Sequence, residues 1–148
     1  MRTTSRVWTY EDYLKLEEEE RYEIIEGGLY HVPGTSRKHQ EVTLELATTF
    51  RSYIKSKDLG KLYISPFDVV LSEEKTSSLK KDTEDKRRLY ASYGVKEFWL
   101  VFPREKVVEV FSLEGTEYRV RSWAYEEGQV CSKLLDGFCV RLEEVLSD

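Results

Sequence analysis

The sequence predicts an α/β fold in which helices flank a mixed β-sheet. Apolar residues recur at helical spacing across residues 39–57, and several shorter runs rich in valine, tyrosine and phenylalanine are typical of strands. The 148 residues are 40% hydrophobic, which is enough to bury one core without help from a metal. We therefore expect a single domain spanning residues 1–148.

The first elements are a short helix and a β-hairpin. Thr9 precedes Tyr10-Glu11-Asp12 and is placed to cap a helix, with Asp12 three residues further on. Residues 22–25 and 29–32 read as two strands, and they flank Glu26-Gly27-Gly28. We expect both glycines to adopt the positive φ of a tight hairpin turn.

A long helix and a strand are expected next. The helix covers residues 39–57, with Gly60 as its stop signal. Its apolar positions are Val42, Leu46, Phe50, Tyr53 and Ile54. Residues 62–71 read as a strand interrupted by Pro66, because proline cannot donate to a ladder.

The second half of the chain alternates apolar runs with turn residues. Leu89, Tyr90 and Tyr93 indicate a helix that ends at Gly94. The run 97–101 is the kind of strand that is buried on both faces, so Glu97 needs a partner, and Lys86 or Arg88 is a candidate. Further strands are expected at 107–111, 118–123, 130–131 and 138–140, followed by a helical turn at 142–146.

Composition excludes several classes of protein. A net charge of −5 argues against nonspecific nucleic-acid binding by the whole surface, although it leaves room for a local basic groove. No apolar run approaches the length of a membrane helix and the start carries no signal-type apolar core, so we expect a cytoplasmic protein. Cys131 and Cys139 do not form a CxxC pair and have no nearby histidine, which favours two buried thiols over a zinc site.

Several motifs occur in a familiar order. They are Trp8-Thr9-Tyr10-Glu11-Asp12-Tyr13, Arg21 to Tyr30 (RYEIIEGGLY), Pro66 to Leu71 (PFDVVL), Lys86 to Tyr90 (KRRLY), and Gly94 to Val101 (GVKEFWLV) with Pro103. Each motif alone is weak, but together they cover most of the chain. The sequence resembles the Uma-type family of restriction endonucleases, whose hairpin typically reads YELIDGEL.

The resemblance implies a restriction-endonuclease-like fold of the PD-(D/E)XK kind and a Mg²⁺-dependent nuclease acting on DNA. Such sites use paired carboxylates because Mg²⁺ prefers oxygen ligands, and the metal activates water and neutralises charge on the scissile phosphate. In the family, the aspartate comes from a QPD motif and the glutamate from a strand of the type DLVVEILSPST.

The chain departs from this pattern between Lys75 and Thr76. The sequence passes there directly to Thr76-Ser77-Ser78-Leu79, which resembles the end of SPST. A few dozen residues, including both carboxylate motifs, are missing relative to the family, and Phe102 replaces the usual aspartate before Pro103. Either the protein has lost this segment or the printed sequence omits it.

The remaining candidates follow from the resemblance. Lys86 matches the family lysine, and Glu23 and Asp68 are candidate catalytic groups and metal ligands. Residues 76–88 carry five basic against three acidic residues, so Lys80, Lys81, Arg87 and Arg88 are candidate nucleic-acid contacts. Lys86, Glu23 and the basic run also have a plainer interpretation as solvated charged surface, whereas Asp68 interrupts an apolar strand, where a charge is costly unless it is paired or functional. Glu26 could lie near the metal pocket, and His39 is expected to be structural.

Two functions from different classes remain open. The first is a Mg²⁺-dependent DNA endonuclease with an incomplete active site, built from Glu23, Asp68 and Lys86. The second is a noncatalytic module of nuclease ancestry that binds DNA or a partner protein. Because loss of a central strand would open a sheet edge, a homodimer is expected in either case.

Overall fold

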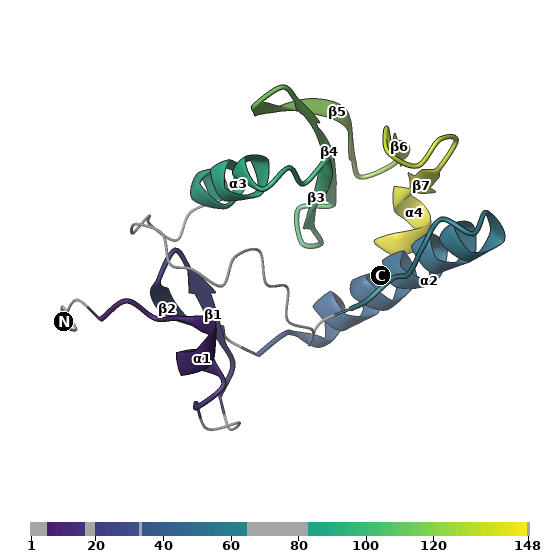
Figure 1. Ribbon diagram of the computed structural model, residues 1–148. Helices are drawn as coiled ribbons and strands as arrows, with labels where there is room; N and C mark the ends of the chain where they lie inside the picture. The colour runs from purple at the N-terminus through teal and green to yellow at the C-terminus, as the bar shows by residue number, and fades with distance from the viewer. Residues whose placement is uncertain (1–5, 17–19, 33, 65–82, 148) are drawn as a thin grey trace. The chain divides into compact units, whose positions relative to one another are not determined.

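The computed structural model describes residues 6–16, 20–32, 34–64 and 83–147. The chain divides into two compact units, one of residues 1–34 and 68–86 and the other of residues 35–67 and 87–148. The expectation of one domain over residues 1–148 stays a prediction. The α/β class and the N-terminal hairpin are confirmed, and the strands pair antiparallel in three small sheets (Figure 1).

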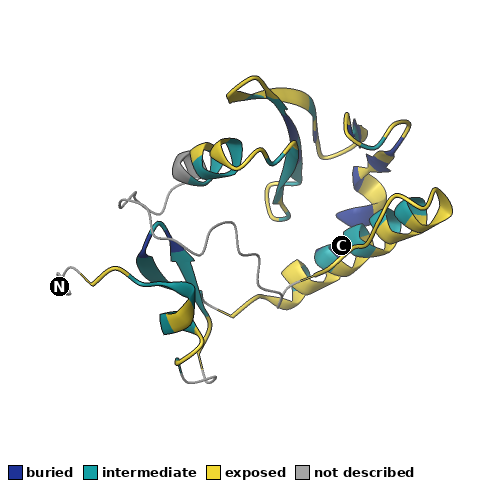
Figure 2. Cartoon of the chain, in the orientation of Figure 1, coloured by how far each residue is buried: buried dark blue, intermediate teal, exposed yellow. Residues whose placement is uncertain are grey.

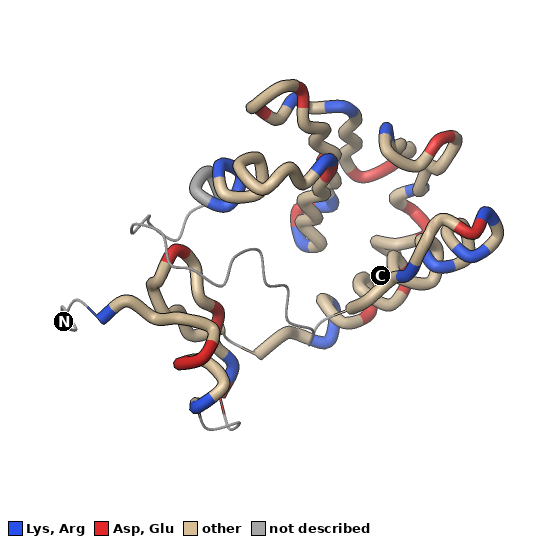
Figure 3. The backbone as a smooth tube through the Cα atoms, in the orientation of Figure 1, with Lys and Arg blue, Asp and Glu red and all other residues tan. Residues whose placement is uncertain are grey.

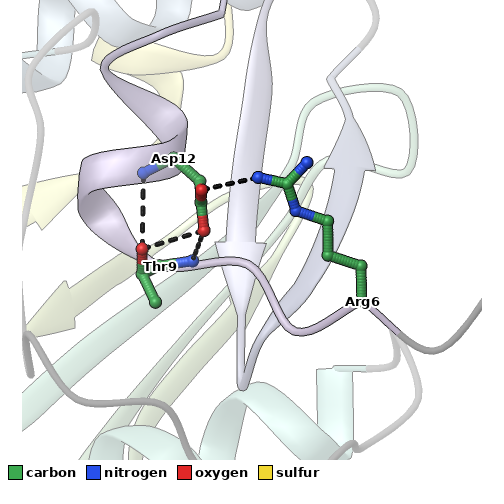
Figure 4. Close-up of polar contacts among 3 residues, drawn as sticks. All are labelled: Arg6, Thr9 and Asp12. Carbon is green, nitrogen blue, oxygen red and sulfur yellow. Dashed lines mark hydrogen bonds and ion pairs between the residues drawn. The ribbon is translucent and has the colours of Figure 1, made fainter.

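The first unit opens with α1 (Tyr10–Tyr13), whose start is held by the predicted capping residues. The Asp12 backbone N–H donates to Thr9 Oγ1 at 3.3 Å, and the Thr9 N–H donates to Asp12 Oδ2 at 3.1 Å. Arg6 adds an ion pair of 2.6 Å to Asp12 Oδ1 (Figure 4). This capping box satisfies N–H groups that have no partner within the helix.

The hairpin consists of β1 (Tyr22–Ile25) and β2 (Gly28–His31), in the register that pairs Glu23 with Tyr30. Its turn differs from the prediction, because Glu26 and Gly27 adopt positive φ (47° and 78°) whereas Gly28 is the first residue of β2. Positive φ at both central residues suits a two-residue hairpin loop. A Cβ at Gly28 would lie 2.9 Å from Cε2 of the Tyr30 ring, so a larger residue there would require that ring to shift.

The second unit begins with α2 (Arg37–Ser56). Ser36 caps it, accepting a hydrogen bond from the His39 N–H at 3.2 Å. Val42 is buried in the core, and Leu46, Phe50 and Tyr53 pack against the core residues, as their spacing predicts. The helix ends before Gly60, because Lys57 is its C-cap and Asp58 takes a positive φ of 51°.

The largest sheet has the order β3-β4-β5 and is antiparallel throughout. Its strands are Glu97–Phe102, Val107–Glu114 and Glu117–Tyr125. The helix α3 (Thr83–Ser92) precedes it and ends, as predicted, before Gly94, which has a φ of 71°. The prediction that β3 is buried on both faces is wrong: β3 is an edge strand of the described sheet, and Phe102 is 40% exposed.

The C-terminal elements are β6 (Gln129–Cys131), β7 (Cys139–Arg141) and α4 (Leu142–Val145). Cys131 and Cys139 are directly opposed in the β6–β7 register and form a disulfide. The expectation of two buried free thiols is therefore wrong, because sequence spacing does not show which residues a short strand pair brings face to face.

The core of the second unit lies between the sheet and the helices α2 and α4. Figure 2 shows its buried residues gathered on β4, β7 and α4. The members with the least exposure are Val108, Val110, Val130, Val140 and Leu142. The predicted strand at 62–71 is not seen where the structure describes it, since residues 61–64 have no strand partner; the rest of that run lies outside the described residues.

Candidate functional site

Two predicted site residues that are far apart in sequence meet in the first unit. Lys86, near the start of α3, places its Nζ 3.4 Å from Oε1 and 3.5 Å from Oε2 of Glu23 on β1. About a third of each side chain is exposed, 37% for Lys86 and 33% for Glu23. The two groups form an ion pair, and their exposed atoms remain accessible to a solute.

Glu26, at the turn of the same hairpin, carries a second carboxylate. Its Oε2 is buried and has no hydrogen-bond partner within the described part of the chain. A buried carboxylate oxygen without a donor is costly, so a cation or a hydrogen-bond donor would be favoured beside it.

These groups do not by themselves make a Mg²⁺ site. Mg²⁺ is held by near-octahedral oxygen ligands, whereas the described residues contain no group of three or more aspartate, glutamate, histidine or cysteine side chains that could hold a metal. The nearest charged neighbour of Glu23 is the ammonium of Lys86, which repels a cation. We therefore derive no catalytic step through a metal ion.

The other predicted site residues are not seen in contact with the Lys86–Glu23 pair among the described residues. Asp68, Lys80 and Lys81 lie outside the described residues. The Arg87 guanidinium carbon lies 4.2 Å from the ring centroid of Phe111 and 6.0 Å from that of Phe98, so this side chain packs on the sheet as a cation–π partner. Arg88 is exposed on α3.

Glu97 has a structural role, but the prediction that it pairs with Lys86 or Arg88 is wrong. Its carboxylate accepts hydrogen bonds from Trp99 Nε1 at 2.9 Å, Ser132 Oγ at 2.6 Å and the backbone N–H groups of Lys133 and Leu134 at 2.8 and 3.0 Å. Partial burial would raise the pKa of Glu97, but the hydrogen bonds from Ser132, Trp99 and the two amides outweigh it and lower the pKa. The carboxylate thus fastens the 132–136 loop to β3.

Sequence reasoning missed a basic groove in the second unit. It lies between α2 and the segment that follows it, with Arg51, Lys55 and Lys61 among its lining residues. A signal for it exists in the spacing of Leu44, Thr48, Arg51 and Lys55, which form a second stripe along the helix. The stripe is easily overlooked because the core-facing stripe of the same helix is more apolar.

A comparison with protein-family models matches the chain to Uma2, described as "Putative restriction endonuclease". The match covers residues 10–78 and 73–143, which is most of the chain. The chain belongs to the Uma2 family. No curated protein matches the sequence.

The Uma2 match comes in two segments that overlap at residues 73–78, and Lys75 and Thr76 lie within that overlap. The Uma2 assignment suggests a nuclease, and the restriction-endonuclease-like proteins generally use a divalent metal. Among the described residues, no helix is both long and apolar enough to cross a membrane.

Proposed function

We propose that this Uma2 protein is a Mg²⁺-dependent DNA endonuclease of the restriction-endonuclease-like superfamily with an incomplete active site. The observation that carries the proposal is the contact between Lys86 and Glu23, which brings together two residues 63 positions apart that match family motifs. We assign Lys86, Glu23 and Asp68 to catalysis, and Glu23 and Asp68 to metal binding. Residues 65–82, which include Asp68, would have to supply the further oxygen ligands.

The residues present suggest how a phosphodiester is engaged. The Lys86 ammonium, partly exposed beside Glu23, would pair with a nonbridging phosphate oxygen and offset the charge that grows on it during attack by water. The Glu23 carboxylate would orient the ammonium.

A cleavage assay tests this proposal. Supercoiled plasmid and single-stranded DNA are incubated with the full chain in Mg²⁺ or Mn²⁺, and we expect slow cleavage that EDTA abolishes. Lys86→Ala and Glu23→Gln should each lower the rate about 100-fold or more, since a positioned charge in such a site contributes on that order. The matched control is Lys96→Ala, an exposed lysine outside the assigned site, which should retain the wild-type rate.

The alternative is a noncatalytic module of nuclease ancestry that binds DNA or a partner protein. The specific observation in its favour is that the described residues contain no cluster of metal-binding side chains. A salt-sensitive shift of DNA in gels, without cleavage in either metal, would replace the endonuclease proposal with this one.

We further propose that the chain forms a homodimer through β3. Among the described residues β3 pairs only with β4, so its other edge has no strand partner there. The strand reads Glu-Phe-Trp-Leu-Val-Phe and lacks the lysine, proline or bulge that usually protects an edge. A second copy of the same strand is a natural partner for such an edge.

A further inference from the structure

A second face of the α2 helix, separate from its core-facing side, lines a groove. Leu44, Thr48, Arg51 and Lys55 follow one another at intervals of three and four residues, so they form a stripe apart from the core-facing Val42. The segment 60–64 lines the other side, and the two enclose a groove of about 570 Å³.

The groove lining contains apolar residues that are open to solvent, which we call its floor. Leu44 is 62% exposed, Ile64 52% and Leu62 36%, and the Tyr63 ring is 58% exposed beside them. Isolated exposed apolar residues are ordinary, but a contiguous set that lines a groove is typical of a binding surface.

Basic residues also line the groove, and we call them its rim. They are Arg51, Lys55 and Lys61, and Asp58 is the single acidic residue in the lining. Figure 3 shows basic residues at the C-terminal end of α2. Residues 35–67 hold six basic against three acidic residues, whereas residues 1–34 hold eight acidic against four basic residues, in a chain of net charge −5. The groove is thus a local positive region on an acidic protein, where an anionic ligand is favoured.

We propose that this groove binds a single strand of DNA, with its phosphates on Arg51, Lys55 and Lys61 and its bases on Tyr63 and the apolar floor. A single strand combines an anionic backbone with flat apolar bases, which is the chemistry that a basic rim around an apolar floor complements. Duplex DNA would offer phosphates and base edges but not base faces, because its bases are stacked inside. The inference rests on the proposed function for the choice of DNA, and it assigns strand binding to a surface remote in sequence from Lys86.

The test measures fluorescence anisotropy of a labelled oligothymidylate of about 12 nucleotides, a length within the usual site sizes for single strands. The full chain is titrated in EDTA at several salt concentrations, so that cleavage does not interfere. Three neutralised phosphates predict a slope of about −2 in log affinity against log salt. Arg51→Ala with Lys55→Ala should weaken binding at least about tenfold and reduce the slope to about −0.7.

Tyr63→Ala separates stacking from charge. It should weaken binding about fivefold while leaving the salt slope unchanged, because the ring contacts bases rather than phosphates. The matched control is Arg37→Ala with Arg121→Ala, which removes two exposed positive charges outside the groove and should change affinity less than about twofold. Circular dichroism of each variant verifies that the fold is retained.

Three results would overturn the inference: no binding of the oligonucleotide, tighter binding of a duplex of the same length, or equal losses in the groove and control variants. None of them bears on the endonuclease proposal, which depends on plasmid cleavage and on Lys86. Conversely, groove-dependent strand binding without cleavage in Mg²⁺ or Mn²⁺ would support this inference while rejecting the endonuclease.

Discussion

At the scale of single residues, the role of each glutamate depends on the hydrogen-bond donors and charges around its carboxylate. Glu23 faces one ammonium, and Glu26 has a buried oxygen without a donor among the described residues. Glu97, by contrast, receives four hydrogen bonds. Glutamate is therefore a candidate reactive group in the hairpin, whereas in β3 its hydrogen bonds hold a neighbouring loop in place.

Glu97→Gln should destabilise the protein by about 1–3 kcal/mol at pH 7, since an amide –NH₂ cannot accept the bonds that one carboxylate oxygen receives. The folded-state pKa of Glu97 lies below its ordinary value of 4.5. Its contribution to stability is therefore full above that value and is lost as the pH falls through the lowered pKa. Urea unfolding at pH 7, 4 and 3 should show the wild type losing part of its advantage over Glu97→Gln at the acidic end.

A control is Glu114→Gln, whose carboxylate is exposed and lies 3.5 Å from Lys133 Nζ; it should change stability by less than about 1 kcal/mol. Equal stability of Glu97→Gln and the wild type at pH 7 would show that the four hydrogen bonds contribute nothing net.

At the scale of elements, the shortest pieces depend most on links outside themselves. β6 and β7 have three residues each, which is too few for an isolated pair to be stable in water. The Cys131–Cys139 disulfide closes this pair, and the loop within it carries Ser132 and Phe138, which contact Glu97 and the core.

Replacing both cysteines by serine should lower the free energy of unfolding by about 2–3 kcal/mol, because the cross-link restricts the unfolded chain. The wild type in dithiothreitol should show the same urea midpoint as the double variant, and the variant itself should not respond to the reductant. If dithiothreitol does not change the urea midpoint of the wild type, or if the native protein has two reactive thiols, the assignment of the disulfide is contradicted. The expected cytoplasmic location stays a prediction. The disulfide does not favour it, because disulfides are uncommon in a reducing cytoplasm.

At the scale of the whole molecule, the proposed dimer depends on the edge of β3 that pairs with no strand among the described residues. Phe102→Lys places a charge at the end of this strand, where the side chain is already 40% exposed and the cost to folding is small. An edge lysine disfavours pairing with a second strand, so we expect the variant to be a monomer and the wild type a dimer in sedimentation equilibrium.

Val120→Lys is the control, since Val120 is 56% exposed on β5, at the opposite edge of the sheet. It should leave the dimer intact. A monomeric wild type, or dissociation by Val120→Lys and not by Phe102→Lys, would exclude β3 as the interface.

The sequence by itself determined the local elements and the family. Helical spacing located α2, Thr9 with Asp12 located α1, and Gly94 located the end of α3, because periodicity, capping and positive φ are properties of neighbouring residues. The order of the motifs along the chain pointed to the Uma2 family, and the hairpin with its Glu23 came with it.

Only the tertiary structure decided which distant groups meet. The ion pair of Lys86 with Glu23, the four donors around Glu97 and the Cys131–Cys139 bond each join residues whose distance depends on how the elements pack and pair. The groove beside α2 also depends on the return of segment 60–64 along the helix. Spacing along the chain determines which face of a helix or strand a side chain occupies. Packing determines which groups that face contacts, and the chemistry of a site depends on those contacts.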